Sequence, residues 1–134
     1  MTTPLSLIAR KAELTGLRNA LDVGGAMLKF YTNSMPAKPE EVTSETLLGT
    51  ILLAETSGTV GNAADLATLT LTVPQVATAA TTGVLGFVRL TNGAGDVFMD
   101  LAAGVAGSGM PVIVNVLQVY TGGEMQLVSC VIAK

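Results

Sequence analysis

The stretch GVLGFVRLTNGAGDVFMDL, residues 83–101, has the clearest hairpin pattern in this chain. Two runs rich in β-branched and aromatic residues flank the short segment 91–96, whose composition is typical of a turn. Its Asn92-Gly93 pair can supply positive φ values and is a strong hairpin signal. We therefore expect strands at 83–90 and 97–101 that pair with each other.

The same alternation of short β-rich runs and turn residues extends from residue 26 to residue 134. The Gly122-Gly123 pair predicts a second hairpin between the last two strands. The Thr- and Ala-rich run 76–83 is either a flexible loop or an exposed edge strand. The pattern predicts a mainly β fold, a jelly roll or related antiparallel β-sandwich of about seven or eight strands. The remaining strands are expected at 27–31, 47–53, 64–73, 111–120 and 125–132.

Residues 4–22 have a helical period, because four leucines recur at helical spacing with charged residues between them. Thr3 is the expected N-cap, Pro4 the first helical residue and Gly24-Gly25 the stop. We expect one domain, 1–134, with a helical segment at 1–23 and a β-domain at 26–134. The leucines are Leu7, Leu14, Leu17 and Leu21.

The composition argues against an enzyme. The 134 residues include no His, no Trp and one Cys, whereas general bases at neutral pH and zinc ligands are most often His or several Cys. We expect neither catalysis nor a cofactor. Only 13% of the residues are charged, which is little for a soluble surface and predicts that other subunits cover part of it.

Four sets of residues are weighed as sites, and the simpler explanation is favoured for each. The glycine-rich run 104–109 lacks the spacing and following helix of a phosphate loop. The Asn and Asp side chains at 92, 96 and 100 could offer oxygen ligands to calcium but are typical of a hairpin turn. The acidic residues at 40–45 have no Trp nearby to bind a sugar, and the serines have no His to activate them. The residues are Asn92, Asp96 and Asp100; Glu40, Glu41 and Glu45; and Ser57 and Ser108.

Nucleic acid and membrane are not expected partners. The net charge is −3 and the seven cations are scattered, so there is no basic stripe to neutralise phosphates. The long uncharged stretches 66–88 and 101–123 are broken by Gly and Pro and predict strands rather than membrane spans. The N-terminus lacks the features of a secretory signal and is interpreted as mature sequence.

Cys130 lies in an apolar run and is expected to be a buried free thiol, in a protein that folds in a reducing cytoplasm. The Phe and Tyr residues are expected to pack in the core, because they lie in predicted strands or at strand ends.

The order of segments resembles that of small structural proteins of tailed bacteriophages. The resemblance is carried by LRNALD at 17–22, AMLKFYT at 26–32, the Met35-Pro36 loop, LLGTIL at 47–52, GVLGFVRL at 83–90 with the turn that follows, and the closing segment 112–132. It covers most of the chain and includes no catalytic signature. It implies a jelly-roll cement or decoration protein that binds the major capsid protein and stabilises the shell.

From this resemblance we expect a protein of the virion surface, made in the bacterial cytoplasm, that self-associates as a dimer or trimer and binds the shell by non-covalent contacts. The alternatives are a tail or baseplate component of the same kind of virus and a carbohydrate-binding β-sandwich. The residues expected to contact other subunits are Leu7, Leu14, Leu17, Met35 and Pro36. The helix leucines have an equally favoured alternative role, which is to pack on the chain's own sandwich.

Overall fold

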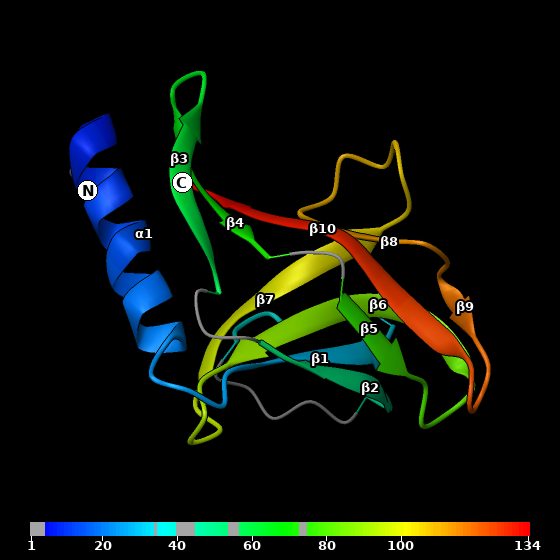
Figure 1. Ribbon diagram of the computed structural model, residues 1–134. Coiled ribbons are helices and arrows are strands. Elements are labelled where there is room, and N and C mark those ends of the chain that lie inside the picture. The colour runs from blue at the N-terminus through cyan, green and yellow to red at the C-terminus, as the bar shows by residue number, and fades with distance from the viewer. Residues whose placement is uncertain (1–4, 34, 40–44, 54–56, 73–74) are drawn as a thin grey trace.

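A computed structural model of the chain describes residues 5–33, 35–39, 45–53, 57–72 and 75–134. The fold is mainly β, as predicted, with one helix beside a curled, sandwich-like arrangement of strands (Figure 1). The elements are α1 (Leu7–Leu21), β1 (Met27–Thr32), β2 (Leu47–Leu52), β3 (Gly58–Ala63), β4 (Leu66–Leu71), β5 (Gln75–Thr78), β6 (Gly83–Thr91), β7 (Val97–Gly104), β8 (Val112–Val114), β9 (Gln118–Val119) and β10 (Glu124–Ala133).

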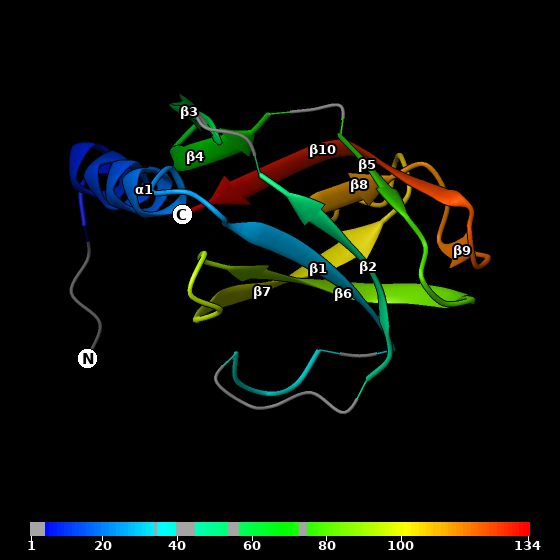
Figure 2. The same ribbon diagram turned by 60° about the horizontal axis from the view of Figure 1, so that its bottom comes forward.

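The strands are joined in the order β2-β1-β6-β7-β8-β10-β4-β3, with β5 on β10 and β9 on β6. Figure 2 shows β1, β2, β6 and β7 as one layer and β10 with β4 and β5 as the layer facing it. The leucines, valines and Phe30 buried between these layers form the core. Because β8 pairs with β7 on one side and with β10 on the other, the two layers are parts of one curled sheet.

The predicted hairpin is confirmed, since β6 and β7 pair antiparallel with Arg89 opposite Asp100. The turn differs from the expected one, because Gly95, with φ +91°, takes the left-handed conformation instead of Asn92-Gly93. Asn92 instead accepts hydrogen bonds from the Ala94 and Asp96 amides through its side chain. Gly93 is a position of close approach, because a Cβ there would run into the carbonyl oxygen of Gly24.

Three strand predictions were wrong in detail. The expected strand at 64–73 is only the second half of a hairpin, because β3 precedes β4 and the chain turns at Ala64, whose φ is +51°. The expected strand at 111–120 is split into β8 and β9. The pairing is not purely antiparallel, since β8 lies parallel to β7. The Thr- and Ala-rich run supplies β5, a strand on β10, in agreement with the edge-strand alternative.

The helix starts later than predicted. Ser6 is the N-cap, and its side chain accepts a hydrogen bond from the Ala9 amide at 3.1 Å. Thr3 and Pro4 lie outside the described residues. The helix packs against β3 and β4, with Leu14 and Leu21 buried, so it covers one end of the sandwich.

The aromatic residues occupy three different environments. Phe30 is in the core, and Phe98 packs against the core from a partly buried position. Phe87 is buried on the opposite face of its sheet, where Tyr31 stacks on it with ring centroids 5.3 Å apart. Tyr120 is 67% exposed, so its predicted core position was wrong. The predicted burial of Cys130 is confirmed, because this free thiol is fully buried.

Candidate functional site

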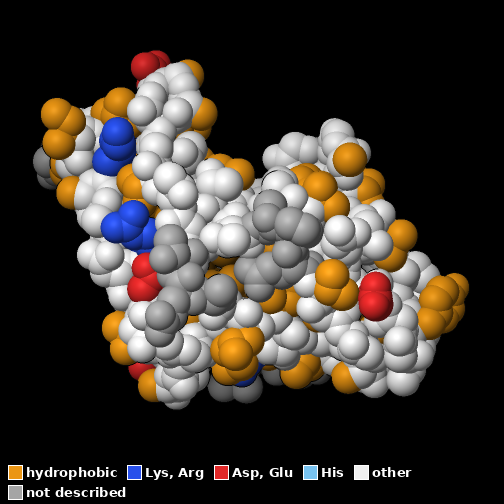
Figure 3. All heavy atoms as spheres, in the orientation of Figure 1, with side chains coloured by type: hydrophobic (Ala, Val, Ile, Leu, Met, Phe, Trp, Pro, Cys, Tyr) orange, Lys and Arg blue, Asp and Glu red, His pale blue; other side chains and the backbone are white. Residues whose placement is uncertain are grey.

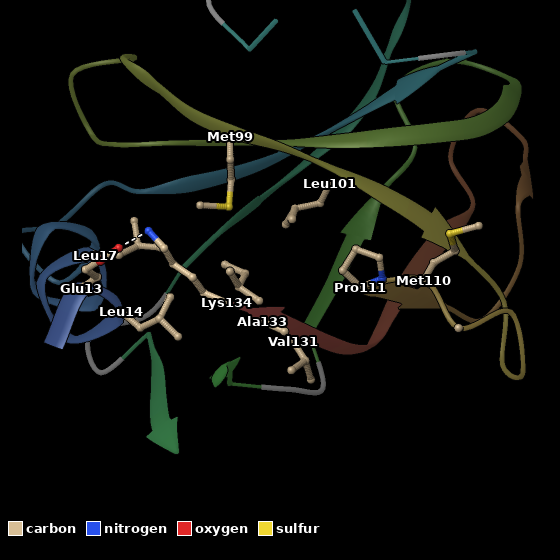
Figure 4. A pocket seen from close by; sticks show the side chains of 12 residues that line it. Glu13, Leu14, Leu17, Met99, Leu101, Met110, Pro111, Val131, Ala133 and Lys134 are labelled. Carbon is tan, nitrogen blue, oxygen red and sulfur yellow. Dashed lines mark hydrogen bonds and ion pairs between the residues drawn. The ribbon is translucent and has the colours of Figure 1, made fainter. Parts of the chain in front are cut away.

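An apolar hollow of the described structure lies where the curled sheet opens. β8 lies between β7 and β10 at one end, pairing with Ala103 and Gly104 on one side and with 127–130 on the other. Toward their other ends β7 and β10 diverge, and α1 closes the wide end of the gap (Figures 1 and 4). The result is an apolar groove with a volume of about 770 Å³.

The apolar groove reaches the core. Leu14, Leu101 and Ile132 line it and are also core residues. Met99 and Leu17 point toward each other across its α1 end, and Met110 and Pro111 mark the end at β8 (Figure 4). The complete lining is Glu13, Leu14, Leu17, Met99, Leu101, Gly109, Met110, Pro111, Val131, Ile132, Ala133 and Lys134.

Two charged side chains line the apolar groove, and they neutralise each other. Lys134 extends along it and its ammonium group pairs with the Glu13 carboxylate of α1 (Figure 4). Arg10 donates a hydrogen bond to the carbonyl oxygen of Lys134 at 3.0 Å, which fastens the end of β10 to the helix. The two side-chain charges of the lining therefore balance.

The structure places the five predicted contact residues in two separate regions. Leu14 is buried in the chain's own core, and Leu7 and Leu17 pack against that core from partly buried positions. Met35 is 44% exposed, and Pro36 is half-buried. The segment 35–39 runs along the far side of the layer that contains β6 (Figure 2). The helix leucines thus take the alternative role of packing on the sandwich, and contact with another subunit stays a prediction for all five.

Sequence reasoning missed most of the apolar groove. Met99, Leu101 and Ile132 belong to strands that were predicted, but their apolar side chains carry no sign that one edge of the strand is free. Met110 and Pro111 follow the glycine-rich run, where the chain leaves the line of β8. The signal that could have located the groove is the run of small residues at 102–109, because β7 ends within it at Gly104 and β8 begins only at Val112.

A buried ion pair lies on the outer face of the β6 layer. Arg89 and Asp100 form a two-fold hydrogen-bonded ion pair, with Nε–Oδ1 and Nη2–Oδ2 distances of 2.7 and 3.0 Å. Their side chains are only 6% and 4% exposed. The hydrogen bond with Asp100 raises the pKa of the Arg89 guanidinium, against the opposing effect of burial. A bidentate pair this buried fixes the register of β6 on β7.

The residues weighed as chemical sites have structural roles. Asn92 and Asp96 close the hairpin turn, and Asp100 is held by Arg89. Glu45 accepts a hydrogen bond from the Asn33 side chain at 2.6 Å, while Glu40 and Glu41 lie outside the described residues. Ser108 Oγ accepts from the Met110 amide at 3.4 Å, and the Ser57 amide donates to Asp22. Burial raises the pKa of the Cys130 thiol to about 12.

In the part of the chain that the structure describes, no group of three or more His, Cys, Asp or Glu side chains is arranged to hold a metal ion. Among the same residues, no helix has the length and apolar character needed to cross a membrane.

The surface carries many large apolar side chains. Fourteen of them are exposed in the described residues, from Leu5 and Ile8 near the N-terminus to Val128 in β10. On the face shown in Figure 3 hydrophobic side chains are spread widely, whereas Lys and Arg lie mostly on the side of α1. Single exposed hydrophobic residues are ordinary, and the less usual feature of this chain is that only 13% of its residues are charged.

No protein-family model, no curated protein and no solved structure matches this chain.

Proposed function

We propose that this protein is a cement or decoration protein of a tailed-bacteriophage capsid, which self-associates and binds the major capsid protein on the virion surface without catalysing a reaction. The observation that carries the proposal is the surface, where fourteen large apolar side chains are exposed on a chain with few charges. Such a surface is stabilised when other protein covers it.

The sandwich-like fold supports the proposal. Its layers bury a continuous core, so the domain can stay folded while its outer faces and free strand edges contact neighbours. A rigid domain loses little conformational entropy on binding, which favours a non-covalent clamp across subunits. The sequence resemblance to phage cement proteins supplies the identity of the partner.

The carbohydrate-binding alternative predicts an exposed aromatic cluster. All five aromatic residues lie in the described part of the chain, and only Tyr120 among them is exposed. A lone tyrosine is a poor sugar platform, so this alternative is not favoured. The tail or baseplate alternative needs the same fold and differs only in its partner.

The test is a sedimentation assay with purified protein and expanded capsid shells that lack it. Co-sedimentation that saturates at a fixed ratio to the major capsid protein, together with a higher disruption temperature of the shells, supports the proposal. Absence of shell binding combined with incorporation into isolated tails would replace it with the tail alternative. Failure to bind either would overturn both.

A further inference from the structure

We infer that the apolar groove accepts a short, extended, uncharged segment of the major capsid protein, which adds a strand to the free edge of β7. The inference rests on the proposed function for the identity of the partner. Its physical basis is that the groove occupies a strand position that β8 fills at one end only.

The strand register shows the vacant position. β8 places Val112 opposite Ala103 of β7 and opposite Cys130 of β10. The backbone pairing with β10 begins one residue before β8, because the Val131 amide donates a hydrogen bond to the carbonyl oxygen of Pro111 at 3.0 Å. Before Pro111 the chain turns away, with Gly107 and Gly109 at positive φ. Beyond this point the space between β7 and β10 is the apolar groove.

The backbones beside the groove can accept another strand. Residues 97–102 of β7 pair with β6 on one side, and within the described residues no strand pairs with them on the other. On the β10 side, Lys134 exchanges backbone hydrogen bonds with Ala67 of β4. Because successive residues of a strand direct their N–H and C=O groups to opposite sides, those of Ala133 face the groove. A free strand edge with an apolar floor is the arrangement used in β-strand addition.

The lining determines the chemistry of the segment. Leu14, Leu17 and Ile132 offer apolar contacts to its inward side chains. The Glu13 and Lys134 charges neutralise each other, so a charged side chain entering the groove would lose water without gaining a partner. The complementary occupant is therefore extended and uncharged, with small or branched apolar side chains at alternate positions.

The first experiment uses a peptide of six alternating valine and threonine residues, capped at both ends, as the probe. Amide hydrogen exchange of the intact protein is measured with and without it. We expect exchange at 97–101 to slow at least tenfold at saturation. A peptide of the same length with a central proline, which cannot complete the pairing, is the control. No slowing at 97–101, or equal slowing by the proline peptide, would overturn the inference.

Variants then connect the groove to the shell. Met110→Glu places a charge at the groove, and Val116→Glu is the matched control, because both native side chains are 44% exposed but Val116 is not part of the lining. We expect Met110→Glu and a second variant, Ala133→Glu, to weaken peptide and shell binding at least tenfold, while Val116→Glu binds as the wild type does.

The outcomes separate this inference from the proposed function. If the wild type binds the peptide at β7 but does not bind shells, the cement proposal fails and the vacant strand position stands without its assigned partner. If the wild type binds shells and both groove variants bind equally well, the cement proposal stands and the groove inference is overturned.

Discussion

The ion pair between Arg89 and Asp100 shows how a single pair of residues constrains the sheet. Both side chains are almost fully buried, so removing one leaves an uncompensated charge that water cannot solvate. We expect Arg89→Met alone or Asp100→Leu alone to lower the free energy of unfolding by about 3–5 kcal/mol. The measurement is equilibrium unfolding in urea.

The double variant Arg89→Met/Asp100→Leu is the control for this prediction. It replaces the pair with apolar side chains of similar volume, so we expect stability near that of the wild type. Single variants that each lose less than about 1 kcal/mol would show that the pair is solvated like a surface salt bridge.

Cys130 makes a prediction about pH. Burial raises the pKa of its thiol from 9.0 to about 12, so the folded state holds the proton in a range where the unfolded state releases it. This contribution to stability is complete below about pH 9 and is lost as the pH rises toward 12. At pH 10 the loss should be about 1.4 kcal/mol.

Comparison of wild type with Cys130→Val isolates this effect, because all other titrating groups are shared. We expect the difference in unfolding free energy between the two proteins to shift by that amount between pH 8 and pH 10. An unchanged difference would mean that the thiol is not protected from solvent. Slow labelling of the native thiol by a disulfide reagent is an independent check.

The helix α1 stabilises the sandwich through one face. Leu14 is 4% exposed and Ile8 is 82% exposed, and both are on the same helix. We expect Leu14→Ala to destabilise the protein by about 2–5 kcal/mol through a cavity, and Ile8→Ala to change stability by less than about 0.5 kcal/mol. Thermal unfolding followed by circular dichroism measures both. Equal effects would mean that the helix is not docked as described.

The β3–β4 hairpin has a strained turn. Ala64 takes a φ of +51°, a conformation that costs a residue with a Cβ about 1–2 kcal/mol and costs glycine little. Ala64→Gly should therefore raise the free energy of unfolding by about 0.5–1 kcal/mol, after allowing for glycine's larger entropy loss. Ala64→Val, which stiffens the same position, should lower it. Equilibrium unfolding of both variants in urea measures whether each substitution raises or lowers the free energy of unfolding.

The elements that could be predicted from the sequence are those marked by patterns among neighbouring residues. The hairpin at 83–101 was predicted because strand formers flank turn residues, and the helix because its leucines recur with a helical period. β3 was missed because Gly58 and Gly61 interrupt any apolar alternation. The parallel contact of β8 with β7 could not be predicted, since the small-residue loop between them has no feature that fixes the direction of return.

The sequence allowed a contact surface to be predicted, but not the position of the apolar groove. Composition predicted that other subunits cover part of the surface, and this stays a prediction, although the described surface exposes fourteen large apolar side chains. The apolar groove, however, combines α1, β7 and β10, which are far apart in the sequence. Leu14 illustrates the limit, because a helical period identifies its buried face but not whether that face meets the same chain or another.

The proposed mode of shell binding predicts its dependence on salt. An interface made by apolar side chains and backbone hydrogen bonds has little long-range attraction to screen, whereas charge-steered binding weakens steeply with ionic strength. The seven cations and ten acidic residues are few, and the two in the apolar groove pair with each other. Binding to shells should therefore be nearly unchanged between about 50 and about 500 mM sodium chloride. It should be stronger in sodium sulfate, which favours the burial of apolar surface. Sedimentation at each salt concentration measures this, and binding lost at high chloride would show that charges hold the protein on the shell.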